Sequence, residues 1–282
     1  MSVSVHTEHA RSWYAASANP TPQRPALEGE IECDVCVVGA GFTGISAALH
    51  LAEQGQNVVV LETARVGFGA SGRNGGQIVN SYSRDMDVIE AKYGDETARA
   101  LGDMAFEGNR IIRERIERYA IDCDLRNGNL FAACNAKQMQ SLIEHKALWE
   151  RYGNREMELL EGDALKREVV SDRYVGGLVD HSGGHLHPLN LVLGEAAAFE
   201  SLGGTIYEQT PVESLEHGAP VDLRTPRGRV RAQRVVMAGN AYLKGVLPEI
   251  EGKSMPCGTQ VITTEPLGEA RARSLIPNHM AV

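Results

Sequence analysis

Residues 33–62 read CDVCVVGAGFTGISAALHLAEQGQNVVVLE, and this stretch decides the fold. The run 34–38 is mostly apolar, as in a strand that is covered on both faces of a parallel sheet. Gly39, Gly41 and Gly44 follow it directly with the spacing G-x-G-x-x-G. In such a turn the first glycine permits a sharp bend, the second lets backbone approach a pyrophosphate, and the third lets the helix pack closely. The stretch therefore predicts a dinucleotide-binding turn.

The segments after these glycines supply the context that the motif requires. Phe42 to Gln54 carries apolar residues on one face and predicts a helix, whose positive N-terminal end would face the phosphates. Val58 to Leu61 predicts a second strand, and Glu62 follows it, 62 − 44 = 18 residues after the last glycine. A carboxylate at this place accepts hydrogen bonds from ribose hydroxyls and repels a 2′-phosphate. An unphosphorylated adenosine ribose is therefore expected.

Composition limits the class of protein. The chain has 282 residues, of which 43% are hydrophobic, so it is long enough for two globular domains. A net charge of −9 argues against a nucleic-acid partner. No run approaches the ~18 apolar residues of a membrane-spanning helix, and the first thirty residues contain no signal-peptide core. We therefore expect a cytoplasmic protein without a membrane partner.

A second glycine-rich segment, 66–77, reads VGFGASGRNGGQ where a nicotinamide-binding fold would continue with a helix. Its glycines leave many backbone N–H groups unshielded, and Arg73 can offset phosphate charge. The segment is typical of a loop that lies along a large ligand. A loop that is merely flexible is the alternative interpretation.

The middle of the chain lacks a βαβ rhythm. Residues 97–119 predict an amphipathic helix, and Asn127-Gly128 between two apolar runs predicts a hairpin turn. Residues 180–188 read DHSGGHLHP, in which Gly183 and Gly184 predict a turn. The three histidines of this segment could bind a metal, but a structural or substrate-facing loop is preferred because no helical H-E-x-x-H accompanies them. This alternation of hairpins and helices, without parallel βαβ units, predicts an inserted α+β domain.

The five cysteines are an odd and scattered set, which does not indicate a disulfide framework. Cys33 and Cys36 make a C-x-x-C pair on the first predicted strand, with no second pair to complete a zinc site. We interpret them as small buried side chains, and no metal is expected. Further along, Val235 to Met237 predicts a strand that delivers Ala238 and Gly239 to the sheet edge, where a second close approach to the dinucleotide would occur.

These motifs resemble those of the flavin-dependent amine oxidases of the D-amino-acid oxidase superfamily. Four segments, namely 12–19, 68–77, 180–191 and 255–265, are similar to the branch of the family that oxidises gamma-glutamylputrescine. The resemblance covers almost the whole chain. It implies a Rossmann-like α/β FAD-binding domain with an interleaved α+β substrate domain.

The resemblance also implies domain bounds and binding residues. The FAD-binding domain would comprise 31–122 and 188–250, the substrate domain 123–187 and 251–282, and an N-terminal arm 1–30. The residues expected to bind FAD are Gly39, Gly41, Phe42, Thr43, Gly44, Glu62, Ser71, Gly72, Arg73, Asn74, Gly75, Gly76, Gln77, Val212, Ala238 and Gly239. Residues 73–76 would run beneath the flavin, and the backbone of Val212 would meet the adenine.

The implied reaction oxidises a primary amine to an imine, which hydrolyses to an aldehyde and ammonia, while oxygen reoxidises the flavin and yields hydrogen peroxide. The partners are therefore a small-molecule amine and oxygen, and the sequence assigns neither a catalytic residue nor an oligomeric state. Family members continue well beyond the position of Val282, so the chain is expected to lack a C-terminal part. The alternatives are another oxidase of the superfamily, acting on sarcosine, glycine or a D-amino acid, and a non-catalytic fragment.

Overall fold

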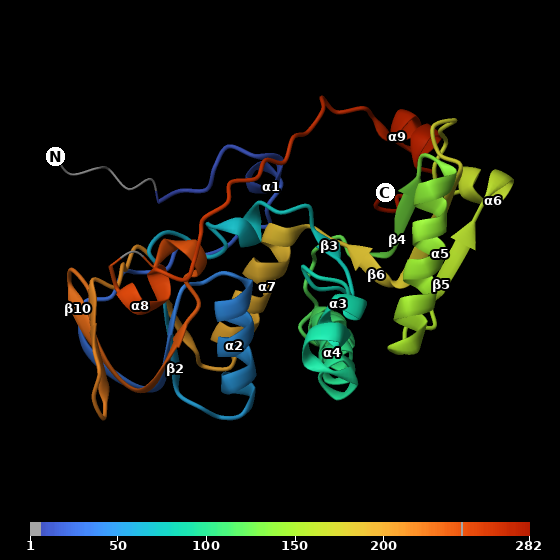
Figure 1. Ribbon diagram of the computed structural model, residues 1–282. Helices are drawn as coiled ribbons and strands as arrows, with labels where there is room; N and C mark the ends of the chain where they lie inside the picture. Colours follow the sequence, from blue (N-terminus) through green and yellow to red (C-terminus); the bar gives the residue numbers. More distant parts are fainter. Residues whose placement is uncertain (1–6, 244) are drawn as a thin grey trace. The chain divides into compact units, whose positions relative to one another are not determined.

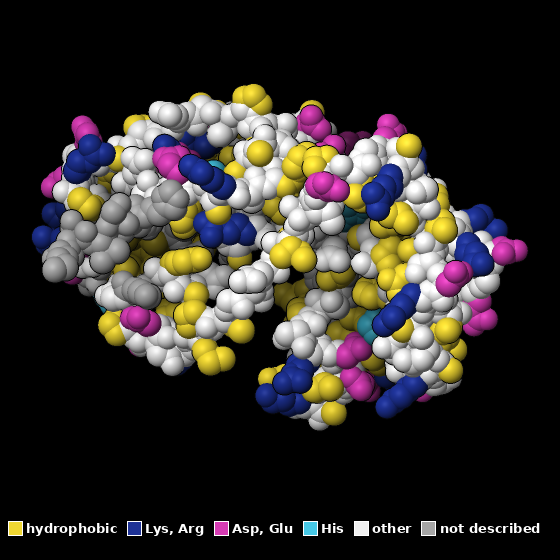
Figure 2. All heavy atoms as spheres, turned by 90° about the horizontal axis from the view of Figure 1, so that it is seen from above, with side chains coloured by type: hydrophobic (Ala, Val, Ile, Leu, Met, Phe, Trp, Pro, Cys, Tyr) yellow, Lys and Arg dark blue, Asp and Glu magenta, His cyan; other side chains and the backbone are white. Residues whose placement is uncertain are grey.

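The computed structural model describes residues 7–243 and 245–282 (Figure 1). The chain divides into two compact units. Unit 1 comprises 1–74, 119–123 and 188–262, and unit 2 comprises 75–118, 124–187 and 263–282. On the face in Figure 2, basic and acidic side chains are interspersed over both units. Within the described residues, none of the helices combines the length and hydrophobicity needed to cross a membrane.

Unit 1 is built on a six-stranded sheet with the order β7-β2-β1-β10-β9-β8. The first four of these strands are parallel, and β9 and β8 are antiparallel additions. The strands are β1 (Gly29–Val38), β2 (Val58–Leu61), β7 (Thr205–Tyr207), β8 (Ser214–Glu216), β9 (Val221–Arg224) and β10 (Gly228–Met237). The helices are α1 (Trp13–Ala16), α2 (Phe42–Glu53), α7 (Pro188–Ser201) and α8 (Pro248–Glu251), with short 3₁₀ turns η1 (Ala70–Gly72) and η2 (Asn240–Tyr242).

Both faces of this sheet are buried, which explains the uninterrupted apolar run of β1. Val35 and Val37 belong to the core beneath the paired helices α2 and α7, together with Ile45 of α2. Cys36 and Val38 face the opposite core, which β9 and β10 complete. Because alternate residues of a strand point to opposite faces, each side of β1 requires small apolar residues. The predicted Rossmann-like α/β fold is confirmed.

Unit 2 contains an antiparallel sheet in which β6 is the central strand. Its neighbours are β3, β4 and β5. The strands are β3 (Gln77–Ile78), β4 (Arg126–Ala133), β5 (Met157–Leu160) and β6 (Gly176–His185). The helices are α3 (Met86–Tyr93), α4 (Asp95–Arg118), α5 (Ala136–Arg151), α6 (Gly162–Lys166) and α9 (Glu269–Leu275). Trp149 of α5 is fully buried in the cluster that joins α3, α4 and α5.

This packing differs from the expected domain bounds. Residues 75–118 were assigned to the FAD-binding domain, but they lie in unit 2. The reason is that β3 pairs with β6 and that α3 and α4 pack on α5. Residues 251–262, which were expected in the substrate domain, lie in unit 1.

Two predicted turns are wrong. Gly183 and Gly184 lie inside β6, and Gly128 lies inside β4, where the pairing with β6 is irregular between Asn127 and Asn129. A Cβ on Gly184 would lie 2.4 Å from the Arg126 carbonyl oxygen, so glycine is needed for the strands to approach. Gly128 has a φ of +87°, which is typical of a bulge as well as of a turn.

Candidate functional site

Three parallel strands of unit 1 end side by side. Val38 of β1 is paired with Leu61 of β2 and with Met237 of β10. The residues that follow, Gly39, Glu62 and Ala238, therefore lie at the same edge of the sheet. This is the carboxyl edge, at which open α/β sheets bind their ligands. The structure brings together three of the residues that the sequence singles out, although up to 200 positions separate them (238 − 39 = 199).

The glycines of the first turn are required by close backbone approach. Gly39 has a φ of +105°, and a Cβ there would lie 2.7 Å from the Ala238 carbonyl oxygen. A Cβ on Gly44 would lie 1.9 Å from the Gly39 carbonyl oxygen. Such distances leave no room for a methyl group. The turn is therefore a cradle of bare main chain in front of α2.

Ser71 lies at the N-terminus of α2. Phe42 N donates a hydrogen bond of 2.8 Å to Ser71 Oγ, and a Cβ on Gly41 would meet the same oxygen at 2.8 Å. Gly41 is the N-cap residue and offers no side-chain cap of its own, whereas Thr43 is exposed. The positive end of a helix favours an oxygen ligand. The hydroxyl of Ser71 thus marks a position that accepts hydrogen bonds from this helix end.

Glu62 binds the backbone of the turn. Its two carboxylate oxygens accept hydrogen bonds from Ala40 N at 2.7 Å and from Ala64 N at 2.8 Å. Burial raises the pKa of Glu62, and these two backbone hydrogen bonds oppose that rise. A carboxylate has about four lone-pair sites, so these two hydrogen bonds leave capacity for a ribose hydroxyl. Sequence reasoning missed the structural role of this side chain.

The chain returns to Glu62 after β7. Thr210 N donates to the Glu62 carbonyl oxygen at 2.8 Å, and Gln209 N donates to the Ala64 carbonyl oxygen at 3.0 Å. Val212, which was expected to meet the adenine, follows two residues later and is partly buried against the core of β1, β9 and β10. The segment 209–212 therefore lies beside the acid that was expected to bind ribose.

The loop 67–74 has partners within itself as well as in α7 and the glycine turn, since a Cβ on Gly67 would lie 2.6 Å from the Val192 side chain and Gly67 N donates to the Ala40 carbonyl oxygen at 2.9 Å. A Cβ on Gly72 would lie 2.4 Å from the Gly67 carbonyl oxygen, and the Asn74 amide donates to the carbonyl oxygens of Ala70 and Ser71, each at 3.0 Å. Arg73 is exposed, and its guanidinium carbon lies 4.7 Å from the centroid of the Phe68 ring. Packing therefore explains Gly72 and Asn74 without a ligand.

Gly239 also has a packing role, because a Cβ there would lie 2.4 Å from the Leu243 side chain. It is followed by η2. Ala238 differs from it, because Ala238 N donates to the Val38 carbonyl oxygen at 2.8 Å and its own carbonyl oxygen faces Gly39. Both residues approach the glycine turn, because a Cβ on Gly39 would also lie 3.1 Å from Gly239 Cα.

A buried ion cluster in unit 1 was not predicted. Arg24 binds both carboxylate oxygens of Glu200, at 2.7 and 2.8 Å, and lies 3.5 Å from Glu208. Glu208 also accepts hydrogen bonds from Val66 N and Arg65, each at 2.9 Å. The side chains of Arg24 and Glu208 are only 3% and 4% exposed. Because water does not reach them, each charge is stabilised by the opposite charge beside it. The cluster fixes the N-terminal arm and the start of the loop that follows Glu62.

The rest of the glycine-rich segment belongs to unit 2. Leu186 N donates to the Gly76 carbonyl oxygen at 2.9 Å, and Gln77 is the direct partner of His185 in the antiparallel pair β3 and β6. On its other side His185 pairs with Arg126 of β4. We call the residues Gln77, His185 and Arg126 the polar row. Directly paired residues share one face of a sheet, so these three side chains are neighbours.

The polar row has few partners of its own. His185 Nδ1 is buried without a hydrogen-bond partner in the described part of the chain. Burial lowers the pKa of His185, and the nearby charges of Arg126 and His279 lower it further. Both effects favour the uncharged imidazole. Of the other two histidines of the segment 180–188, His181 is exposed and lies 3.3 Å from Glu158, whereas His187 is buried.

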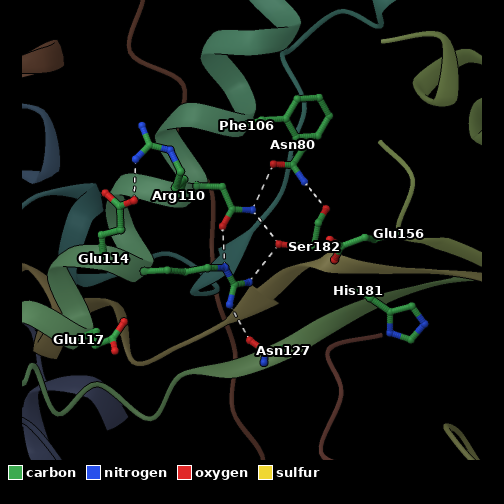
Figure 3. Close-up of a pocket in the computed structure, with 11 residues that line it drawn as sticks. Asn80, Phe106, Arg110, Glu114, Glu117, Asn127, Glu156, His181 and Ser182 are labelled. Atoms are coloured by element: carbon green, nitrogen blue, oxygen red, sulfur yellow. Dashed lines mark hydrogen bonds and ion pairs between the residues drawn. The ribbon is translucent and has the colours of Figure 1, made fainter. Parts of the chain in front are cut away.

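A pocket of about 430 Å³ lies between α4 and β6 (Figure 3). Arg113 links the two elements that line this pocket. Its guanidinium donates to Asn109 of α4 at 2.9 Å and to the carbonyl oxygens of Ser182 and Gly183 of β6 at 3.0 and 2.7 Å. Asn80 in turn donates to Ser182 Oγ at 2.7 Å. These side chains satisfy one another, so the network braces α4 against the irregular part of β6.

Across residues 7–243 and 245–282, no group of three or more His, Cys, Asp or Glu side chains is arranged to hold a metal ion. Cys33 and Cys36 are free and buried on β1, as predicted, and burial raises the pKa of the Cys33 thiol to about 11.

Comparison with known proteins identifies the family. The family model described as FAD dependent oxidoreductase matches residues 34–281. Gamma-glutamylputrescine oxidoreductase of Escherichia coli is 61% identical over 98% of this chain and 65% of its own length. The probable oxidoreductase OrdL of Haemophilus influenzae is 45% identical over 99% of this chain and 66% of its own length. The chain thus spans just under two thirds of these relatives.

Solved structures agree on the fold. L-amino acid deaminase from Proteus myxofaciens matches with a TM-score of 0.66 and 23% identity, over 80% of this chain and 49% of its own. Glycine oxidase from Geobacillus kaustophilus matches with a TM-score of 0.60 and 24% identity, over 75% of this chain and 56% of its own. The glycine turn, the acid after β2 and the family match together show that the chain belongs to the FAD dependent oxidoreductase family.

Proposed function

We propose that the carboxyl edge of β1, β2 and β10 binds the ADP half of FAD. The observation that carries this proposal is the contact of Gly39 with Gly44 and Ala238, at distances that only bare main chain allows. The pyrophosphate would lie on residues 39–44 at the positive end of α2, and Glu62 would accept hydrogen bonds from the adenosine ribose. These residues fit the cofactor that the family uses.

We extend the proposal to the remaining residues. Ser71 would exchange its hydrogen bond with Phe42 N for one with a phosphate oxygen, and Val212 would lie beside the adenine. Arg73, Gly75, Gly76 and Gln77 would follow the flavin, whereas Gly72, Asn74 and Gly239 would support the site through packing. FAD supplies the two-electron oxidation, and the protein supplies binding, orientation and exclusion of water.

The substrate we propose is gamma-glutamylputrescine, because the E. coli relative named gamma-glutamylputrescine oxidoreductase is 61% identical to this chain over the 277 aligned residues. The primary amine would be oxidised to an aldehyde with release of ammonia, and oxygen would be reduced to hydrogen peroxide. A neutral amine is needed for oxidation of the adjacent carbon, so the site must accept the ammonium and release its proton. We expect the reaction to take place in the cytoplasm.

Two measurements test the proposal. The purified chain is titrated with FAD, and bound flavin is followed by its visible absorption and quenched fluorescence. Peroxide release is then measured with gamma-glutamylputrescine, putrescine, sarcosine and glycine. We expect saturable FAD binding and fastest turnover of gamma-glutamylputrescine. Failure to bind FAD would refute the cofactor site, whereas equal or faster turnover of glycine would refute the substrate assignment and favour another oxidase of the family.

A further inference from the structure

The segment 63–67 of unit 1 connects two parts of the proposed FAD site. Glu62, the acid expected to bind ribose, directly precedes it. At its other end Gly67 N donates to the Ala40 carbonyl oxygen of the glycine turn at 2.9 Å. The position of the segment therefore affects how the ribose acid and the glycine turn lie relative to each other, and a residue that fixes the segment also fixes the site.

A second carboxylate, that of Glu208, holds this segment from the inside. Glu62 N donates to the Tyr207 carbonyl oxygen at 2.9 Å, so Glu208 follows the end of the strand next to β2. The Glu208 carboxylate accepts hydrogen bonds from Val66 N and from Arg65 Nη1, each at 2.9 Å. Its side chain is buried. Glu208 thus binds both the backbone and a side chain of the segment.

Two acids at neighbouring strand ends repel each other. Burial raises the pKa of Glu62, and the charge of Glu208 also raises it. An ionised carboxylate is the stronger acceptor for ribose hydroxyls, so cations beside Glu208 favour ribose binding by helping Glu62 to stay ionised. Arg65 and Arg24 supply these cations, at 2.9 and 3.5 Å from the Glu208 carboxylate.

Arg65 also binds the N-terminal arm. Its guanidinium donates to Glu8 Oε1 from Nη2 at 2.8 Å and from Nε at 3.2 Å. Farther along the arm, α1 packs on α7, and Arg24 binds Glu200 of that helix. The arm is therefore attached to the segment 63–67 at Glu8 and to α7 at Arg24. All of these contacts lie within unit 1.

On the basis of the proposed function, we propose that Arg65 is a positioning residue for FAD, through which docking of the N-terminal arm is coupled to binding of the cofactor. Through Glu208 the guanidinium fixes the segment that follows the ribose acid, and through Glu8 it attaches the arm to the same segment. Detachment of the arm leaves Arg65 held by Glu208 alone. Coupling between two binding events is reciprocal, so FAD stabilises the docked arm by the factor by which the docked arm strengthens FAD binding.

Titration of the purified chain with FAD tests the positioning role. Arg65→Met removes the cation between Glu8 and Glu208 and should weaken FAD binding about five- to tenfold, the low end of typical coupling between sites. Arg65→Lys keeps the charge but not the planar fork, so it should retain part of the affinity. The matched control is Arg227→Met, which breaks an exposed pair with Glu28 at the opposite end of β1 from the glycine turn. This control should bind FAD like the wild type.

Limited proteolysis measures the reverse effect, that of FAD on the arm. Trypsin cleaves after the exposed Arg11, and because a protease needs a locally detached chain, the cleavage rate follows the population of the detached arm. Saturating FAD should slow formation of the product that begins at Ser12 about five- to tenfold in the wild type. The protection should be weaker in Arg65→Met. Mass spectrometry identifies the product, and the wild-type measurement is decisive even if a variant fails to fold.

Three results would overturn the coupling. They are unchanged FAD affinity in Arg65→Met, an equal loss of affinity in Arg65→Lys and Arg65→Met, and cleavage after Arg11 at the same rate with and without FAD. A wild-type chain that binds no FAD would refute the proposed cofactor site and the coupling with it. Wild-type binding of FAD that Arg65→Met leaves unchanged would refute the coupling alone.

Discussion

Replacing Gly44 by alanine tests whether the turn is as close as the structure indicates. Helix propensity alone favours alanine over glycine by up to about 1 kcal/mol in a helix interior. Gly44 belongs to α2 and Gly108 to α4, so propensity predicts that Gly44→Ala and Gly108→Ala both stabilise the protein. The surroundings differ, because a Cβ on Gly108 meets nothing within 4 Å, whereas one on Gly44 lies 1.9 Å from the Gly39 carbonyl oxygen.

The structure therefore predicts opposite signs for the two variants. The atom in the way at Gly44 is backbone, which cannot rotate aside, and Ala238 Cβ lies at 3.2 Å on the same methyl position. Overpacking of this kind costs about 1–3 kcal/mol, and the severity of the contact places Gly44→Ala near the upper end. After subtraction of the propensity gain we expect a net loss of about 1–2 kcal/mol in the free energy of unfolding.

Urea unfolding of the two variants and the wild type measures these free energies, and FAD titration follows the cradle itself. Gly108→Ala should be as stable as the wild type or slightly more stable, with unchanged FAD affinity. Gly44→Ala should lose both stability and affinity, because Gly39 must move to admit the methyl group. If Gly44→Ala were as stable as Gly108→Ala, the close approach of α2 to the turn, and the argument for the cradle, would be refuted.

Three further predictions follow from named contacts. Glu62→Gln turns an NH₂ group toward Ala40 N or Ala64 N, so FAD affinity should fall about tenfold, the loss expected for one hydrogen bond to a charged group; unchanged affinity in a fluorescence titration would contradict the role of this acid. Arg24→Met removes the cation that binds Glu200 and leaves Glu208 with Arg65 alone, and it should lower the free energy of unfolding by about 3 kcal/mol, with recovery of part of it when Glu200→Met is added; a single variant within about 1 kcal/mol of the wild type in urea unfolding would show that the pair does not matter. The folded state lowers the pKa of His185, so below about pH 6.5 the unfolded chain binds the proton more readily and stability falls on acidification; His185→Gln should reduce that fall in unfolding curves between pH 7.5 and 5.5, and a pH dependence equal to that of the wild type would disprove the assignment.

The first βαβ unit could be predicted from sequence because its information is local. The apolar run of β1, the three glycines, the helix α2 and Glu62 lie within thirty consecutive residues, and each has one physical role. The fold class follows from this stretch. The double role of Glu62 does not follow from it. The hydrogen bonds from Ala40 N and Ala64 N to this carboxylate depend on how the end of β2 lies beside the glycine turn.

The errors arise where tertiary pairing overrides local turn signals. Gly183-Gly184 and Asn127-Gly128 have the composition of turns, yet both lie in paired strands. In these strands glycine serves the approach of a neighbour, such as the Arg126 carbonyl oxygen against Gly184. A single sequence does not distinguish a glycine that bends the chain from one that admits another strand.

The polar row and the ion cluster could not be predicted from local sequence patterns, because their residues are far apart in the chain. Arg126 and His185 are 59 positions apart (185 − 126), and Arg24 and Glu200 are 176 apart (200 − 24). Nothing in the immediate sequence of either residue indicates its partner. Only the register of β4, β6 and β3 in one case, and the packing of α7 in the other, bring them together.

The ion cluster around Arg24 also constrains how related sequences can diverge. Loss of Arg24 removes the cation that binds Glu200 and leaves Glu208 with Arg65 alone, whereas loss of Glu200 leaves Arg24 with only the more distant Glu208. Replacement of both members of the Arg24–Glu200 pair by apolar residues of similar size leaves this arrangement at a lower cost than replacement of one. Aligned descendants should therefore show positions 24 and 200 changing together, with few intermediates.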